Sequence, residues 1–228
     1  MKGIFVTLAL FFALGALAQE NCSRYYPFKE NTAFEIRSYG TDNNLIAISN
    51  YEVKDVWLTP KGEKAIIAAT VEDGTQNKNS EPVLELECTE ENSIKLNYKS
   101  ILPGFLMEKF SNLDYEVVDA EVEIPNDLQE GEKLPDAKIT MNVRVMPIVM
   151  KVEYKMTNRT VEANETLHTP AGTFNCKVIT YDTVFEKGLK GQGSAKQWIA
   201  EGIGLVKQIE YNNEGAIAGV NILTEFDQ

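Results

Sequence analysis

The stretch from Lys138 to Met156, KITMNVRVMPIVMKVEYKM, decides the fold class. On both sides of Pro147, apolar residues alternate with polar ones, which is the period-two pattern of an extended strand with one buried face. Parallel strands that are covered on both faces would instead read as continuous apolar runs, so the alternation indicates an antiparallel sheet. Pro147 then marks a tight connection between two strands of matched length.

The same alternation recurs through the rest of the chain. It is clear over residues 84–88 and 94–98, and again over 118–124, where Val118, Ala120, Val122 and Ile124 are expected to face inward. Turn residues separate the strands at Asp73-Gly74, at Glu130-Gly131 and in the four-residue loop 212–215. About a dozen strands result, and their edges are best protected by closing the sheet.

One segment breaks the alternation. Between Pro103 and Leu113, apolar residues recur at roughly helical spacing, which predicts one short helix that caps or plugs the sheet. The expected fold is therefore all-β and antiparallel, with a barrel-like or strongly curved sheet and one short helix.

The first residues have the form of a secretory signal peptide. Lys2 supplies the positive charge, residues 4–14 form the apolar region, and Ala16-Leu17-Ala18 is a small-residue cleavage pattern. Cleavage is expected after Ala18, and residues 19–228 are expected to form a single domain. Cys22 does not directly follow the small residues, as a lipid-modified cysteine would, so a soluble product of the periplasm or cell surface is predicted. The apolar run is shorter than the roughly 20 residues of a membrane span, and no later segment approaches that length.

The charge of the chain limits its partners. Removing 18 of 228 residues leaves 210, and because Lys2 is the only charge removed, the net charge changes from −12 to −13. Such a balance argues against nucleic acid or an anionic membrane surface as a partner, because both would be repelled unless a local basic patch intervened. The longest candidate for such a patch, Lys187 to Lys196, is sparse and rich in glycine.

Three cysteines follow the predicted leader: Cys22, Cys88 and Cys176. Export favours disulfides, so one bridge and one free thiol are expected, and all three pairings are open. Cys22 with Cys88 is preferred, because Cys176 lies on the apolar face of a strand and would be inert if buried there.

No catalytic or cofactor-binding constellation is recognisable. His168 is the only histidine, no CxxC pair is present, and the glycine-rich segments match neither a nucleotide-binding nor a nucleophile-elbow motif. His168 is interpreted as a structural residue beside a turn. Acidic residues are too numerous to single out a pair, although Glu201 near Trp198 is a candidate for carboxylate chemistry. We therefore expect no metal, no cofactor and no enzymatic activity.

Adaptable apolar side chains offer a candidate ligand cavity. Methionine thioethers fit irregular ligands, although ordinary core packing is the more common role of such residues. If the barrel is hollow, six residues are expected to line its cavity: Phe105, Met107, Met141, Met150, Met156 and Trp198.

Five segments in order resemble the TapB-like family of exported bacterial proteins. They are residues 21–28, IPNDLQEGEKLPDAKITM (124–141), NRTVEANETLHTPAGTFNC (158–176), KQWIAEGIGLVKQIEY (196–211) and the tail LTEF (223–226). The resemblance implies an all-β, barrel-like fold in the periplasm or at the cell surface, and it carries no established activity.

Three functions follow as hypotheses. The first is an exported barrel-like binding protein that holds an apolar or amphipathic small molecule. The second is a structural or interaction protein that docks onto an envelope protein. The third is a hydrolase that uses two carboxylates, which has the least support because no site is visible.

Overall fold

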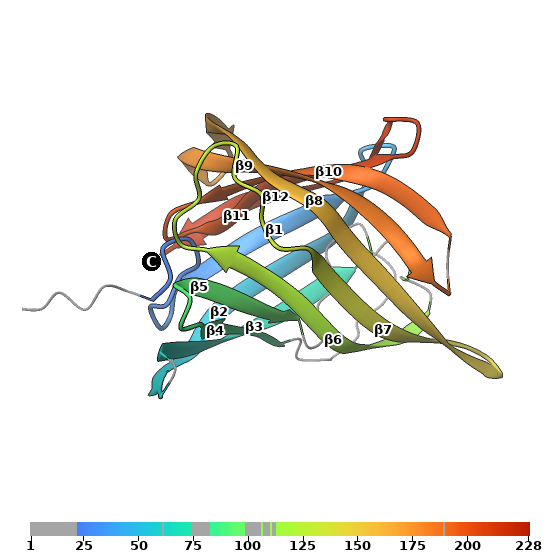
Figure 1. Ribbon diagram of the computed structural model, residues 1–228, viewed down its shortest axis with the longest axis horizontal. Coiled ribbons are helices and arrows are strands. Elements are labelled where there is room, and N and C mark those ends of the chain that lie inside the picture. The colour runs from blue at the N-terminus through green and yellow to red at the C-terminus, as the bar shows by residue number, and fades with distance from the viewer. Residues whose placement is uncertain are drawn as a thin grey trace, which may run out of the picture.

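The computed structural model describes residues 22–60, 62–73, 83–98, 106, 110, 113–188 and 190–228. Within them the chain forms twelve strands (Figure 1). Their bounds are β1 Ala33–Tyr39, β2 Leu45–Thr59, β3 Gly62–Asp73, β4 Val83–Cys88, β5 Ser93–Tyr98, β6 Asp114–Pro125, β7 Ala137–Val145, β8 Ile148–Thr169, β9 Gly172–Lys187, β10 Gly191–Ala200, β11 Gly204–Asn212 and β12 Ile217–Asp227.

These strands close into one antiparallel barrel in which sequence neighbours are also neighbours in space. β1 completes the barrel, because it pairs with β2 on one side and with β12 on the other. The predicted all-β, antiparallel, barrel-like fold is therefore confirmed. Closure satisfies the backbone groups that an open sheet would leave unpaired at its edges.

The barrel has two distinct ends. We call the end at which β1 begins and β12 finishes the disulfide end, because Cys22 and Cys88 lie there. The other end, at which β1 finishes and β12 begins, is the far end. In Figure 1 the disulfide end is on the left and the far end is on the right.

The alternation of the sequence becomes an alternation of burial. On β4, Leu84, Leu86 and Cys88 are buried, while Glu85 and Glu87 between them are half-buried on the other face. Inward-facing side chains of this kind form one large core inside the barrel, to which all strands from β2 to β10 contribute. Burying a large aliphatic side chain stabilises a fold by about 1.5–3 kcal/mol.

A β-bulge corrects one prediction on β6. The register with β7 shifts between Val117 and Asp119, so Val118 is the extra residue and its side chain is 55% exposed. Val117 packs against the core instead. Ala120, Val122 and Ile124 are buried as expected.

The predicted short helix lies mostly outside the described residues. Of that segment, Leu106, Phe110 and Leu113 are described. Leu106 and Phe110 are helical and buried in the main core, and Leu113 packs against it. Side chains from the β5–β6 connection therefore fill part of the barrel interior.

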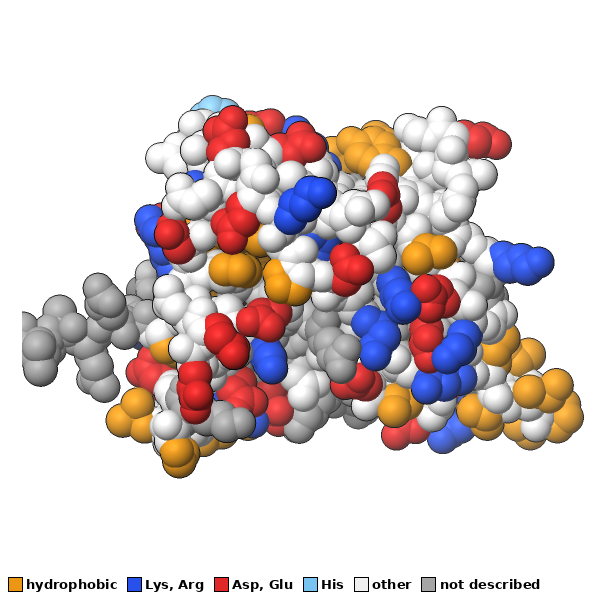
Figure 2. All heavy atoms as spheres, in the orientation of Figure 1, with side chains coloured by type: hydrophobic (Ala, Val, Ile, Leu, Met, Phe, Trp, Pro, Cys, Tyr) orange, Lys and Arg blue, Asp and Glu red, His pale blue; other side chains and the backbone are white. Residues whose placement is uncertain are grey.

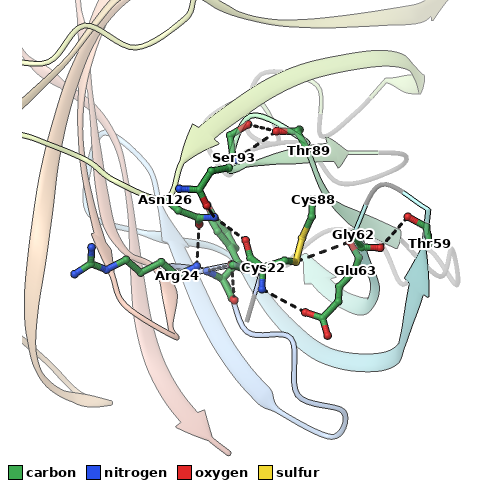
Figure 3. The surroundings of a disulfide bond; sticks show 12 residues. Cys22, Arg24, Thr59, Gly62, Glu63, Cys88, Thr89, Ser93 and Asn126 are labelled. Atoms are coloured by element: carbon green, nitrogen blue, oxygen red, sulfur yellow. Dashed lines mark hydrogen bonds between the residues drawn. A yellow bond between two sulfur atoms is a disulfide. The ribbon is translucent and has the colours of Figure 1, made fainter. Parts of the chain in front are cut away.

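The disulfide end is closed by the chain that precedes β1. Cys22 forms a disulfide with Cys88, with 5.9 Å between their Cα atoms, and this is the pair that the sequence favoured (Figure 3). The side-chain amide of Asn126 donates to the carbonyl of Cys22, and its oxygen accepts from the amide of Arg24 at 2.9 Å. Tyr25 and Tyr26 follow directly and are buried in the core.

A buried arginine supports the same end. The Arg159 guanidinium donates to the carbonyls of Glu123 at 3.0 Å and of Pro135 at 2.7 Å. These bonds hold the connection between β6 and β7 against β8. Burial raises the pKa of the Tyr26 hydroxyl well above its usual value, and the nearby Arg159 charge offsets only part of that rise. The disulfide end is thus a fixed cap rather than an entrance.

Candidate functional site

Polar side chains face the barrel interior along β1, β11 and β12. Ser38 on β1 donates to the side-chain oxygen of Asn221 on β12 at 2.7 Å. Asn221 pairs in turn with Gln208 on β11, and Glu210 follows two residues later on the same face. All four residues are buried. One wall of the interior is therefore polar, whereas the walls from β3 to β8 are apolar.

The other face of β11 explains this orientation. Trp198 on β10 pairs with Lys207, and Ile209 packs with Trp198 in a second, smaller apolar cluster outside the main core. The Lys196 and Lys207 ammonium groups lie 4.8 Å and 5.5 Å from the centre of the Trp198 ring. The face of β11 that carries Ile209 packs in this second cluster. The opposite face, which carries Gln208 and Glu210, therefore points to the barrel interior.

Glu210 is a buried carboxyl group whose pKa is strongly raised. Its side chain is 3% exposed, and desolvation by burial raises its pKa to about 8. Hydrogen bonds from Gln208 and Tyr181 favour the ionised form but are outweighed by burial. At pH 7 the group therefore holds its proton and can donate a hydrogen bond.

Tyrosine and threonine side chains from β8 and β9 complete the surroundings of Glu210. Tyr154 is buried, and desolvation followed by the nearby Glu210 charge raises its pKa well above the usual value. Tyr154 also hydrogen-bonds Thr183, and its ring packs against Phe185 at 5.2 Å between centres. Polar and aromatic side chains thus surround the carboxyl group of Glu210.

A pocket of about 400 Å³ opens beside these residues at the far end of the barrel. Glu210, Tyr154, Thr183 and Phe185 line its inner part, and the remaining lining comes from the rims of β10, β11 and β12 and from Thr41. The volume lies within the range of about 300–1,000 Å³ that is usual for small-molecule pockets. We take this pocket as the candidate functional site.

Four of the six predicted lining residues are described, and the structure separates Trp198 from the three methionines. Met141 and Met156 are buried in the main core, and Met150 is partly buried against it. Trp198 belongs to the second cluster, on the opposite face of the sheet from Gln208. None of these four lines the pocket beside Glu210. Phe105 and Met107 lie outside the described residues.

The other singled-out residues have structural contacts. His168 bonds the hydroxyl of Thr173 at 2.7 Å across the β8–β9 hairpin. Glu201 is exposed and forms an ion pair with Arg24 at 2.7 Å. Cys176 is a buried free thiol, and desolvation raises its pKa to about 11, so it stays protonated at neutral pH. Trp198 donates its indole N–H to Glu165 at 2.8 Å.

Sequence reasoning missed Glu210, Gln208, Tyr181 and Thr183. The alternation in KQIEY places the apolar residues Ile209 and Tyr211 on one face, and that face is the natural choice for the core. In the structure, Trp198 pairs with Lys207, so the face that carries Ile209 packs in the second apolar cluster. The face that carries Gln208 and Glu210 is therefore the one that points into the barrel.

Two absences apply to the described part of the chain. It contains no group of three or more His, Cys, Asp or Glu side chains that could hold a metal ion. Nor does any helix there have the length and apolar character needed to cross a bilayer.

Solved structures of bacterial proteins share the fold. A candidate exported protein with a YmcC-like fold from Bacteroides fragilis superimposes with a TM-score of 0.72 at 18% identity, covering 91% of this chain and 100% of the other. A candidate lipoprotein from Parabacteroides distasonis gives 0.71 at 17% identity, with the same coverage of 91% and 100%. At such identities the likeness shows the fold alone.

Sequence comparison gives a family but no characterised relative. No curated protein matches significantly. Residues 29–223, which include all strands but the last in full, match the DUF3108-like family. The chain therefore belongs to the DUF3108-like family.

Proposed function

We propose that this protein is an exported barrel that binds one amphipathic small molecule through the pocket at its far end. The polar end of the ligand would lie against Glu210, and its apolar part would lie along Phe185 and Tyr154. The observation that carries the proposal is a buried, protonated carboxyl group at the wall of an open pocket. Burying such a group costs free energy, and carboxyl groups kept in this state are concentrated at functional sites.

The chemistry of the site narrows the ligand class. The two side chains that bond Glu210, Gln208 and Tyr181, are neutral, so an anionic head group beside Glu210 would lack a compensating charge. A protonated carboxyl can donate to a hydroxyl or ester oxygen. We therefore propose a neutral, oxygen-bearing head group, such as that of a monoacylglycerol, and disfavour the anion of a fatty acid.

Export belongs to the same proposal. The leader predicted over residues 1–18 lies outside the described residues, but the structural relatives from two bacteria are described as exported or lipoprotein. The disulfide between Cys22 and Cys88 suits an oxidising compartment. We propose the periplasm or the cell surface, and we retain the TapB-like resemblance as a proposed finer placement within the family.

We propose binding rather than catalysis. Glu201, the carboxyl group singled out for a hydrolase, is ion-paired with Arg24 at the closed end of the barrel, away from the pocket. Nucleic acid is not proposed as a partner, because the net charge of −12 would repel it.

Native mass spectrometry and a binding titration test the proposal. The protein is purified from the exported fraction of cells that express the full chain, and a medium-chain monoacylglycerol is compared with the fatty acid of equal chain length at pH 7. We expect a single bound monoacylglycerol and an affinity about tenfold or more above that of the fatty acid, because the carboxylate of the fatty acid would be desolvated without a compensating cation.

Two variants sharpen the outcome. Glu210→Leu removes the hydrogen-bond donor, and it should lower the affinity for the monoacylglycerol by about tenfold, the size expected of one hydrogen bond. Glu214→Ala, in the exposed turn between β11 and β12, is the matched control and should bind as the parent does. Equal binding of both lipids by the parent, or an unchanged monoacylglycerol affinity in Glu210→Leu, would contradict the proposal.

A further inference from the structure

The turn between β7 and β8 is an exposed apolar tip. Residues 145–150 read VMPIVM, without a charge. Met146 is 89% exposed and Ile148 is 65% exposed, and Val145 and Val149 are exposed beside them. The hairpin projects beyond the barrel at the lower right of Figure 1, and the same corner of Figure 2 is covered by hydrophobic side chains. We call residues 145–149 the apolar tip.

Exposed apolar side chains gather at this end of the molecule. Among the residues that the structure describes, nine large hydrophobic side chains are exposed, and six of them lie at the far end. These six are Leu45, Val145, Met146, Ile148, Val149 and Ile217. Scattered exposed hydrophobics need no explanation, but a set concentrated on one rim marks an interaction surface.

Basic side chains lie behind the apolar tip. Arg144 directly precedes it on β7, and Lys151 follows shortly after it on β8. Lys187 and Lys190 flank Gly188, where an added Cβ would lie 2.7 Å from the carbonyl oxygen of Lys151, so this turn abuts β8. Figure 2 shows Lys and Arg side chains on the face next to the tip.

Acidic side chains compensate this basic group only in part. Asp114 pairs with Arg144 at 2.7 Å, and Glu153 pairs with Lys187 at 2.8 Å and with Lys151 at 3.5 Å. Glu116 also acts on the charge of Arg144, so four cations face three carboxylates, in a chain whose net charge is −12. Because these cations are largely exposed, their ion pairs are weak and can be exchanged for phosphate oxygens.

We propose that the apolar tip inserts into the surface of a phospholipid bilayer, with the surrounding Arg and Lys side chains against the headgroup phosphates. The surface of a bilayer has phosphate groups on the outside and apolar acyl chains beneath them. A convex, uncharged tip can reach the acyl chains while the cations behind it contact the phosphates. A rigid protein partner would instead require a complementary groove. Docking in this way turns the pocket beside Glu210 towards the bilayer, but it does not depend on whether that pocket holds a ligand.

Vesicle flotation tests the inference. Exported protein is mixed with phosphatidylethanolamine vesicles that contain phosphatidylglycerol, and binding is measured as a partition coefficient. We expect flotation with the vesicles, and a fall of about tenfold for the double substitution Met146→Ser with Ile148→Ser, because both side chains then lose their transfer into the acyl layer. Vesicles without phosphatidylglycerol should bind more weakly, because their surface lacks the net negative charge.

Matched controls separate docking from other effects. Leu58, which is 68% exposed in the β2–β3 hairpin at the disulfide end, should be replaceable by serine without loss of flotation. Glu210→Leu should also float as the parent does, so that a failure of ligand binding is distinguishable from a failure of docking. A Met146→Trp variant should be quenched by brominated acyl chains, which reports insertion directly.

Three results would overturn the inference. Leu58→Ser could lower flotation as much as the tip substitutions do, or Met146→Trp could show no quenching. The third result is a protein that sediments as a dimer and becomes a monomer when the tip is substituted. The last result would assign the apolar tip to contact with a second copy of the chain.

Discussion

At the scale of the residue, Glu210 lies in an environment that opposes the charge its carboxyl group normally carries. Its carboxyl lies in the barrel interior beside Tyr154 and bonds Gln208 and Tyr181. None of these neighbours carries a positive charge at neutral pH, so burial keeps the proton on the acid. A group in this state makes the stability of the fold sensitive to pH.

We expect stability to fall as the pH rises. The folded pKa of Glu210, about 8, is raised above the value near 4.5 of the free side chain, so its contribution is fully present below pH 4.5 and is lost progressively up to pH 8. The loss is on the order of a few kcal/mol. Thermal unfolding of the parent and of Glu210→Gln, measured between pH 5 and pH 9, checks this. The variant should lack most of the decline, and a parallel decline in both proteins would refute the assignment.

At the scale of the element, the bulge on β6 decides which of two adjacent valines belongs to the core. Val117 pairs with Met141 and packs inside, whereas Val118 is the inserted residue and faces solvent. Beyond the bulge, Ala120 again faces the barrel interior, so the inward-facing side chains of the rest of β6 are buried.

Substitution of the two valines should have very different effects. Val117→Asp places a charge against the apolar interior and should lower the free energy of unfolding by roughly 2–3 kcal/mol. Val118→Asp should change it by no more than about 0.5 kcal/mol, because surface substitutions rarely do more. Urea unfolding of both variants gives the comparison. Equal destabilisation would mean that β6 has a regular register.

At the scale of the whole molecule, the barrel is fixed at one end and open to a pocket at the other. The disulfide end is held by the Cys22–Cys88 bridge, by the bonds of Asn126 and by the buried Arg159. The far end carries the pocket, the apolar tip and most of the exposed apolar side chains. This division places the proposed binding and docking surfaces together, away from the cap.

Loss of the bridge should weaken the whole fold. The disulfide spans a sequence separation of 66 residues, and a loop of this size stabilises a fold by roughly 4 kcal/mol in the chain-entropy account. We expect Cys22→Ser combined with Cys88→Ser to lower the free energy of unfolding by about that amount. Arg24→Ala, which removes only the exposed ion pair with Glu201 in the same cap, should cost less than about 1 kcal/mol. A double-serine variant as stable as the parent would show that the remaining bonds are sufficient.

Much of the fold could be predicted from the sequence. The alternation over residues 84–88, 94–98 and 138–156 is local information, because successive side chains of a strand point to opposite faces wherever the strand lies. It therefore determined the strands, their antiparallel arrangement and the need for closure. The four-residue loop at 212–215 was equally local, since a turn depends on few residues, and there Gly215 has a φ of 78°.

The candidate site could not be predicted in the same way. Whether Gln208 and Glu210 face the interior depends on the apolar cluster around Trp198, to which the neighbouring strands β9 and β10 contribute. Trp198 and Met141 lie in different clusters, whereas Glu210 lies close to Tyr154. Both outcomes depend on residues that are far apart in the chain. A strand pattern shows that two faces differ, but the interior of a barrel is defined only when all strands have paired. For this protein the sequence determined the sheet, and the tertiary structure decided which face became the inside.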